Sequence, residues 1–218
     1  MPTEARLLRL LAWLSPAFPV GAFGYSHGLE TAIREGRVTD AASLGRWITV
    51  LLERGSGWTD AVLVRAAWTA ATAEDDAALA EIAELAEALA PSAERHREAM
   101  AQGAAFLTAV AAWRAPPIGR APYCVAVGAS AGAAGIPLEP TLTAWLHAFA
   151  SNLVSVAVRA IPLGQSDAVA TIAGLEGVLL RVAGRAAAST LEDIGSAALL
   201  SDIASMRHET LDGRLFVS

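Results

Sequence analysis

The chain has 218 residues, of which 54% are apolar, 17% charged and 6% aromatic, so it is long enough to bury one sizeable core. Its formal net charge is −6, and every one of its 16 basic residues is arginine. The absence of lysine excludes Schiff-base chemistry, a P-loop lysine on a nucleotide phosphate and the lysine of protein kinases. The negative balance also argues against a nucleic-acid surface, which needs clustered cations facing phosphates.

The composition favours an all-α fold, because alanine, the best helix former, occurs throughout and runs of β-branched residues are rare. Periodicity, capping residues and helix breakers predict a succession of helices along the chain. We expect them over residues 4–14, 26–36, 40–54, about 62–74, 77–89, 92–113, 121–138, 141–160 and 167–182, with a short helix ending near residue 206. This pattern indicates one all-α domain, residues 1–204, a bundle of about eight to ten helices, followed by a C-terminal tail, residues 205–218.

Two uncharged stretches, residues 121–138 and 140–158, approach the length of a membrane span. The first is mostly alanine and glycine, the second carries several polar side chains, and neither is flanked by clustered cations or aromatic residues. We therefore expect no membrane span but two buried helices, the second of them central in the bundle. The spacing of Gly128 and Gly132 indicates a close helix crossing or a subunit interface.

The candidates for chemistry are few. Gly24-Tyr25-Ser26-His27-Gly28 matches the G-x-S-x-G elbow of serine hydrolases, but no strand is predicted before it, so a hydrolase using Ser26 is only an alternative. The four histidines are widely separated, which predicts no metal site, and His147 is expected to be a hydrogen-bonded core residue. The charged run over residues 94–98 is typical of a solvated helix face.

The only cysteine, Cys124, cannot form an intrachain disulfide and is expected to be a small core residue. This usage suits a reducing compartment, and the apolar run before Ser15 is too short for a signal peptide. We therefore expect a cytoplasmic protein. An all-α protein that binds an apolar ligand or a membrane remains a further alternative.

The C-terminal tail is unusual for a chain end because it mixes arginines with large apolar residues. Arg207 and Arg214 stand among Met206, Leu215 and Phe216. Leaving such a segment in water gives up apolar burial of roughly 1.5–3 kcal/mol per large side chain. Two interpretations stay open: the tail packs on its own domain, or it docks on another protein.

Three segments, in this order and at these distances, resemble the urease accessory protein UreF family. They are Leu14-Ser15-Pro16-Ala17-Phe18-Pro19-Val20-Gly21-Ala22-Phe23-Gly24-Tyr25-Ser26-His27-Gly28-Leu29-Glu30, then Ile161-Pro162-Leu163-Gly164-Gln165, and the two pieces Met206-Arg207-His208-Glu209-Thr210 and Arg214-Leu215-Phe216-Val217-Ser218. The resemblance covers nearly the whole chain and includes its all-α character. It implies a dimerising protein that is not an enzyme and that helps insert nickel into apo-urease, acting as a scaffold and regulator between UreD (or UreH) and the GTPase UreG.

The resemblance also implies roles for individual residues. Glu30, Arg159 and Gln165 fall at positions that it connects with the GTPase. The UreD side is carried by the tail, with Arg214 expected to meet a carboxylate or carbonyl and with apolar side chains filling a groove. The residues expected there are Arg207, His208, Glu209, Arg214, Leu215 and Phe216. No cofactor is expected to be held stably, and nickel is expected only in transit.

Overall fold

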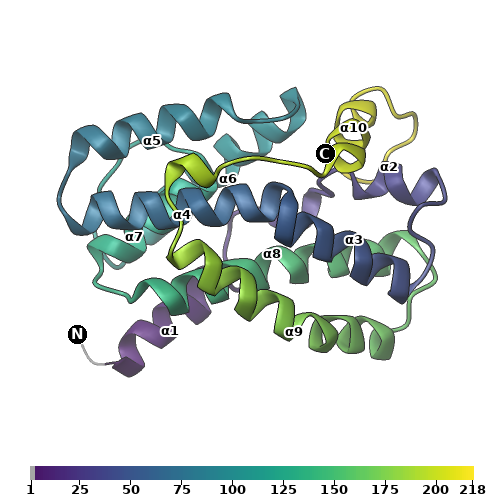
Figure 1. The fold of residues 1–218 in the computed structure, drawn as a ribbon, viewed down its shortest axis with the longest axis horizontal. Helices are drawn as coiled ribbons and strands as arrows, with labels where there is room; N and C mark the ends of the chain where they lie inside the picture. The colour runs from purple at the N-terminus through teal and green to yellow at the C-terminus, as the bar shows by residue number, and fades with distance from the viewer. Residues whose placement is uncertain (1–2) are drawn as a thin grey trace.

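The computed structural model describes residues 3–218, and within that range the chain is helical with no strand. Figure 1 shows an elongated bundle in which α4 and α8 run through the middle and α1 and α10 lie toward opposite ends. The all-α prediction is confirmed. The helices are α1 (Thr3–Trp13), α2 (Leu29–Arg34), α3 (Ala41–Arg54), α4 (Ser56–Thr72), α5 (Asp76–Ala88), α6 (Ala93–Val110), α7 (Tyr123–Ala133), α8 (Leu138–Ala160), α9 (Gln165–Ala187) and α10 (Leu199–His208), with short 3-10 turns η1 (Ala22–Gly24) and η2 (Leu191–Asp193).

Several helix boundaries follow from side-chain caps that the sequence predicts. The Asp40 side chain accepts a hydrogen bond from the backbone N–H of Ser43 at 2.8 Å, and the Ser43 hydroxyl accepts from the backbone N–H of Asp40 in return. Ser92 likewise accepts from the N–H of Arg95 and begins α6. Each cap satisfies a donor that the first turn of a helix leaves free.

Proline and glycine account for two differences from the predicted boundaries. Helix α8 begins at Leu138 and contains Pro140, because the first turn of a helix needs no N–H from the proline. Helix α7 covers only Tyr123–Ala133, less than the predicted range, and Gly135 follows it with a φ of 65°. A left-handed residue of this kind closes helices and is most readily supplied by glycine.

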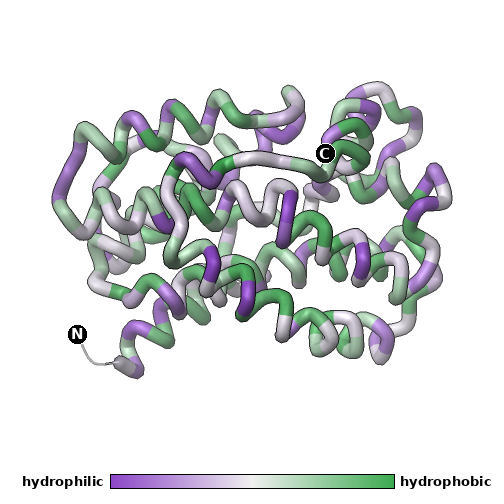
Figure 2. Tube along the Cα trace, viewed as in Figure 1, coloured by the Kyte–Doolittle hydropathy of each residue, from purple (hydrophilic) through white to green (hydrophobic). Residues whose placement is uncertain are grey.

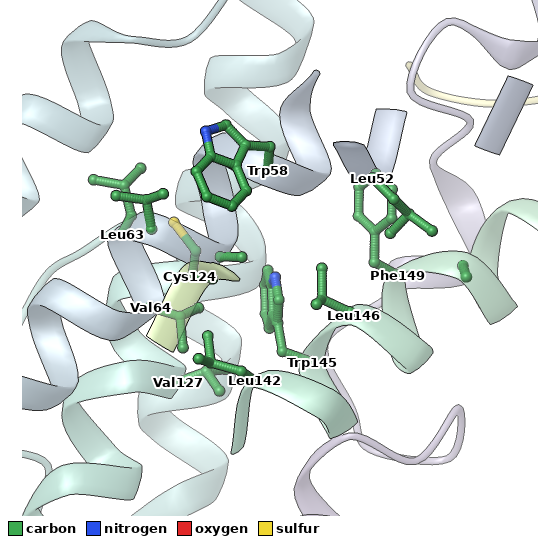
Figure 3. Close-up of a cluster of buried hydrophobic side chains, with 14 of the residues drawn as sticks. Leu52, Trp58, Leu63, Val64, Cys124, Val127, Leu142, Trp145, Leu146 and Phe149 are labelled. Atoms are coloured by element: carbon green, nitrogen blue, oxygen red, sulfur yellow. The ribbon is translucent and has the colours of Figure 1, made fainter. Parts of the chain in front are cut away.

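The core lies between α3, α4, α7 and α8, and Figure 3 shows side chains from all four helices meeting there. Leu142 and Leu146 of α8 are fully buried, and Cys124 is a buried free thiol, as predicted. By length and composition α8 could cross a membrane, but 56% of its most apolar window is buried in the bundle. This burial fits the central position that the sequence predicts for α8.

The contact between α4 and α7 requires glycine. A Cβ on Gly128 would lie less than 3.0 Å from the carbonyl oxygen of Val64, and one on Gly132 would meet the carbonyl of Trp68. Backbone oxygens cannot move aside as a flexible side chain can. The predicted close helix crossing is therefore confirmed, with α4 as the partner of α7.

We predict that Gly128→Ala lowers the free energy of unfolding by about 1–3 kcal/mol, because the new methyl group forces α4 and α7 apart. Gly174→Ala on α9 is the matched control, since no atom lies within 4 Å of its added Cβ. The control should stabilise the protein by about 0.5–1 kcal/mol through helix propensity. Urea denaturation followed by circular dichroism measures both changes, and equal stabilities for the two variants would contradict the crossing.

Candidate functional site

The most unusual feature of the molecule is a cluster of three buried carboxylates. Glu30 of α2 and Glu94 and Glu98 of α6 are each no more than 3% exposed. We call these three residues the carboxylate cluster. Removing an ionised carboxylate from water costs several kcal/mol unless cations and hydrogen-bond donors replace the water. Most of those donors come from the C-terminal end of the chain.

Glu30 binds the backbone just before the C-terminus. Its carboxylate accepts hydrogen bonds from the N–H of Leu215, at 2.8 and 3.1 Å, and from the N–H of Phe216, at 3.1 Å. Arg34, one helical turn on, donates to it at 2.9 Å and also donates to the carbonyls of Asp212 and Gly213. Burial by itself would raise the pKa of Glu30, but these donors together hold it below its ordinary value.

His208, the last residue of α10, lies between two members of the cluster and is fully buried. Its Nδ1 is 2.7 Å from Glu94 and its Nε2 is 3.1 Å from Glu30. The ring therefore joins α2 to α6 through its two nitrogens. Glu94 also accepts from the guanidinium of Arg214, so it holds two side chains from the C-terminal part of the chain.

Glu98 is paired with four side chains. Arg95 and Gln102 donate to it from the same helix, His27 lies 2.8 Å away through Nε2, and the hydroxyl of Ser218 donates at 2.8 Å. Burial would raise the pKa of Glu98, but Arg95, His27 and Ser218 together outweigh it and the pKa falls to about 2. Burial also lowers the pKa of His27, which leaves Arg95 as the main cation at this carboxylate near neutral pH.

The last residues are further fixed by the loop before α2 and by α8. The N–H of Val217 donates to the carbonyl of Gly24 at 2.8 Å, and the N–H of Ser26 donates to the carbonyl of Ser218. The guanidinium of Arg159 lies over the Phe216 ring, 4.5 Å from its centroid, and donates to the carbonyl of Phe23 at 2.6 Å. Residues far apart in the sequence therefore meet at one place.

Side chains alternate in exposure along the last four residues. Phe216 and Ser218 are buried, whereas Leu215 and Val217 are 69% and 62% exposed. The backbone bends at Leu215 and Phe216, whose N–H groups both point to Glu30. The buried members hold the segment on the domain, and the exposed members are available to a partner.

The structure brings together most of the residues that the resemblance singles out. Glu30, Arg159, His208, Arg214 and Phe216 lie in or against the carboxylate cluster, and the backbone of Leu215 binds it. The other three lie outside the cluster. Arg207 pairs with Glu35 at 2.8 Å, Glu209 accepts from the N–H of Ala93 at 2.9 Å, and Gln165 is exposed at the start of α9.

Of the two interpretations left open for the tail, the structure shows the segment packed on its own domain. Residues 205–208 are the end of α10, and we call residues 209–218, which follow that helix, the C-terminal segment. Arg214 meets the carboxylate of Glu94 in its own chain, and Phe216 fills a position in its own core. Helix α10 itself packs against α2 and α6.

Two interpretations of charged and polar residues are wrong. Residues 94–98 are not a solvated face, because Glu94 and Glu98 turn inward to the C-terminal segment and His27. His147 is not a core histidine but lies exposed on α8. One feature of the sequence points to this site. Basic side chains at the chain end, His208 and Arg214, require carboxylate partners, and Glu94 of α6 is the partner of both.

Ser26 does not form a hydrolase elbow. Its side chain is completely buried, and its hydroxyl oxygen accepts from the N–H of Glu30 at 3.4 Å, next to the start of α2. No strand leads into it within residues 3–218. A nucleophile must be exposed at the top of a strand-to-helix turn, so this position is structural.

A cavity of about 220 Å³ lies beside the cluster, between the loop before α2, α6 and α8. Its walls are mostly apolar but include His27, Asp60, Arg95 and Glu98. Burial raises the pKa of Asp60 to about 6, and the nearby Arg95 only partly offsets this. Within residues 3–218 no group of three or more His, Cys, Asp or Glu side chains is arranged to hold a metal ion.

Fold and site together define an all-α protein whose C-terminus is bound into its own domain by buried ion pairs. The sequence model of the UreF family matches residues 38–176. The chain is 54% identical to the urease accessory protein UreF of Mesorhizobium japonicum, over all of this chain and 98% of that protein. It is 53% identical to urease accessory protein UreF 1 of Brucella canis (100% and 96% covered) and 52% identical to UreF of Agrobacterium fabrum (98% and 97%). The chain belongs to the UreF family of urease accessory proteins.

We predict that Glu94→Gln loosens the C-terminal segment, because a neutral amide cannot pair with both His208 and Arg214. Two charge-assisted hydrogen bonds of about 1.5–3 kcal/mol each are weakened. Trypsin should therefore cut after Arg207 and Arg214 at least about tenfold faster than in the unmodified protein. Glu81→Gln on the exposed side of α5 is the control, and equal cleavage rates in all three proteins would refute the anchoring role.

We predict that Asp60→Asn changes the pH dependence of stability. The folded pKa of about 6 lies above the ordinary value of 3.8, so the folded state holds this proton more tightly and stability is lost as the pH rises from about 4 to 6. Asparagine removes that loss. The variant should gain about 1–3 kcal/mol over the unmodified protein at pH 8 and little at pH 4. Denaturant titrations at both pH values measure the difference, and a gain that is the same at both would contradict the assignment.

Proposed function

We propose that this protein assists nickel insertion into apo-urease as a scaffold and regulator that joins UreD to the GTPase UreG. The observation that carries the proposal is family membership over the whole chain, with relatives named urease accessory protein UreF. In this proposal the protein is not an enzyme, works in the cytoplasm and forms a homodimer within the complex.

The site supports a scaffold more readily than a catalyst. Its polar side chains are engaged with one another: the carboxylates of the cluster already bind Arg34, His208, Arg214 and the C-terminal backbone. Such a network stabilises one shape of the surface. Its carboxylates are already hydrogen-bonded within the chain and are poorly placed to activate a substrate. GTP binding is therefore assigned to UreG, and nickel is substrate in transit, held by no stable site in this chain.

In this proposal the residues that the resemblance implies have different tasks. Glu30, His208, Arg214 and Phe216 hold the C-terminal segment in place from inside. On the UreD side, Leu215, Arg207 and Glu209 stay exposed and can touch the partner directly. On the GTPase side, Gln165 is exposed, and Arg159 is fixed by Phe23 and Phe216 at the edge of the same region. In this proposal Glu30 acts on the GTPase side through the loop and segment that it holds, because its carboxylate is buried.

A surface substitution tests the UreD contact better than truncation, since removing the segment would take away at least one donor from each of the three buried carboxylates. We expect Leu215→Asp to keep the helical fold and to lose co-purification with UreD, because the substitution places a charge where an apolar contact is needed. Leu180→Asp, at a similarly exposed position on α9, should bind as the unmodified chain does. Co-expression with UreD, UreG and the urease subunits, followed by size-exclusion chromatography and a urease assay, is the measurement. If the unmodified chain forms no complex with UreD, the proposed function fails.

A further inference from the structure

The cavity beside the carboxylate cluster contains one carboxylate that has no partner. Asp60 of α4 lines this cavity, and within residues 3–218 no hydrogen-bond donor reaches its side chain. Arg95 acts on Asp60 through its charge but donates its hydrogen bond to Glu98. Figure 2 shows that α4 consists mainly of hydrophobic and near-neutral residues, and Asp60 is the only acidic residue in it. A buried carboxylate needs donors or a cation, so Asp60 is open to a ligand.

The other ionisable groups inside the cavity leave its charge at one negative unit. Both oxygens of Glu98 are already engaged, and the guanidinium of Arg95 neutralises its charge. Burial raises the pKa of the Tyr123 phenol and of the Cys124 thiol and lowers the pKa of His27, so all three are uncharged near neutral pH. The charge of Asp60 is therefore the one that remains without compensation.

Two further polar atoms in the cavity walls lack partners among the described residues. Trp145 is only 5% exposed, and its indole Nε1 makes no hydrogen bond. The Nδ1 of His27 is buried and equally without a partner. A neutral imidazole that donates from Nε2 to Glu98 keeps Nδ1 as an acceptor. Unpartnered buried polar atoms around a cavity indicate an occupant that the chain itself does not supply.

The remaining walls of the cavity are apolar and largely aromatic. The ring centroids of Tyr123 and Trp145 lie 5.0 Å apart, and Phe149 stands beside them on α8. A dry cavity of about 150 Å³ is enough to bind benzene, and this one has a volume of about 220 Å³. Two of its wall residues, Phe23 and His147, are exposed, so the cavity opens to the surface between the loop before α2 and α8.

The chemistry of the walls selects among classes of ligand. An anion would be repelled by Asp60. A metal ion would find few free ligands, because the oxygens of Glu98 are engaged, the thiol of Cys124 is protonated, and no cluster of three ligands exists within residues 3–218. An organic ammonium group is suited to the site, because its N–H groups donate to carboxylates and aromatic faces attract cations.

We propose that this cavity binds a small organic ammonium ion, with its charged group on Asp60 and its apolar part against the aromatic walls. The Nδ1 of His27 accepts a second N–H of the same group. Helices α4, α6, α7 and α8 and the loop before α2 all contribute walls, so the space suits a small molecule and not a polypeptide segment. The inference goes beyond the proposed function and does not depend on it.

The test is isothermal titration of the isolated full chain with benzylammonium chloride near neutral pH. We expect saturable binding of one molecule per chain. Benzyl alcohol, which has the same shape without the charge, should bind at least about tenfold more weakly. Asp60→Asn should also weaken the binding of benzylammonium at least about tenfold. Asp167→Asn, at an exposed position on α9, is the matched control and should bind as the unmodified chain does.

Three results would overturn the proposal. The first is equal affinity for benzylammonium and benzyl alcohol, or an Asp60→Asn variant that binds as well as the unmodified chain. The second is the absence of binding in the millimolar range for both benzylammonium and the smaller methylammonium. The third is Asp60-dependent binding of potassium or nickel chloride when neither ammonium ion binds, since an inorganic cation would then be the occupant. The comparison with benzyl alcohol uses the unmodified chain, so it decides the question even if Asp60→Asn does not fold.

Discussion

The need to pair three buried carboxylates governs the arrangement of this molecule. Glu30, Glu94 and Glu98 lie in the interior, where an unpaired charge would cost several kcal/mol. More than half of their partners come from the end of the chain: His208, Arg214, the hydroxyl of Ser218 and two backbone N–H groups. The C-terminal segment is therefore a structural part of the domain, and the buried carboxylates beneath it fix its position on the surface.

This constraint gives a physical reason why the chain end can take part in recognition without being flexible. A segment that orders only on binding loses conformational entropy at that moment and binds more weakly for it. Here the buried pairs have already fixed the segment, and the alternation of its last residues leaves Leu215 and Val217 outside. The same pairs hold α10 against α2 and α6.

The rest of the bundle supplies a rigid frame for this site. Small residues allow α4 and α7 to approach until a Cβ on Gly128 would meet the backbone of α4. Helix α8 passes through the centre and supplies Arg159, which binds the Phe23 carbonyl and the Phe216 ring at one end of the bundle. Close helix contacts of this kind resist deformation, because packed interiors have few alternative arrangements.

Local features of the sequence determined the helices and several of their boundaries. Alanine content, the caps at Asp40 and Ser92 and the glycines of α7 act over a few residues, so they could be read without a fold. The family resemblance likewise pointed to residues that meet at the carboxylate cluster, including Glu30, Arg159 and the chain end. Only the tertiary structure decided what these residues do. Glu94 and His208 are 114 positions apart, and the burial that turns the charged run of α6 from a solvated face into an ion-pair site arises only when α10 packs on α2 and α6.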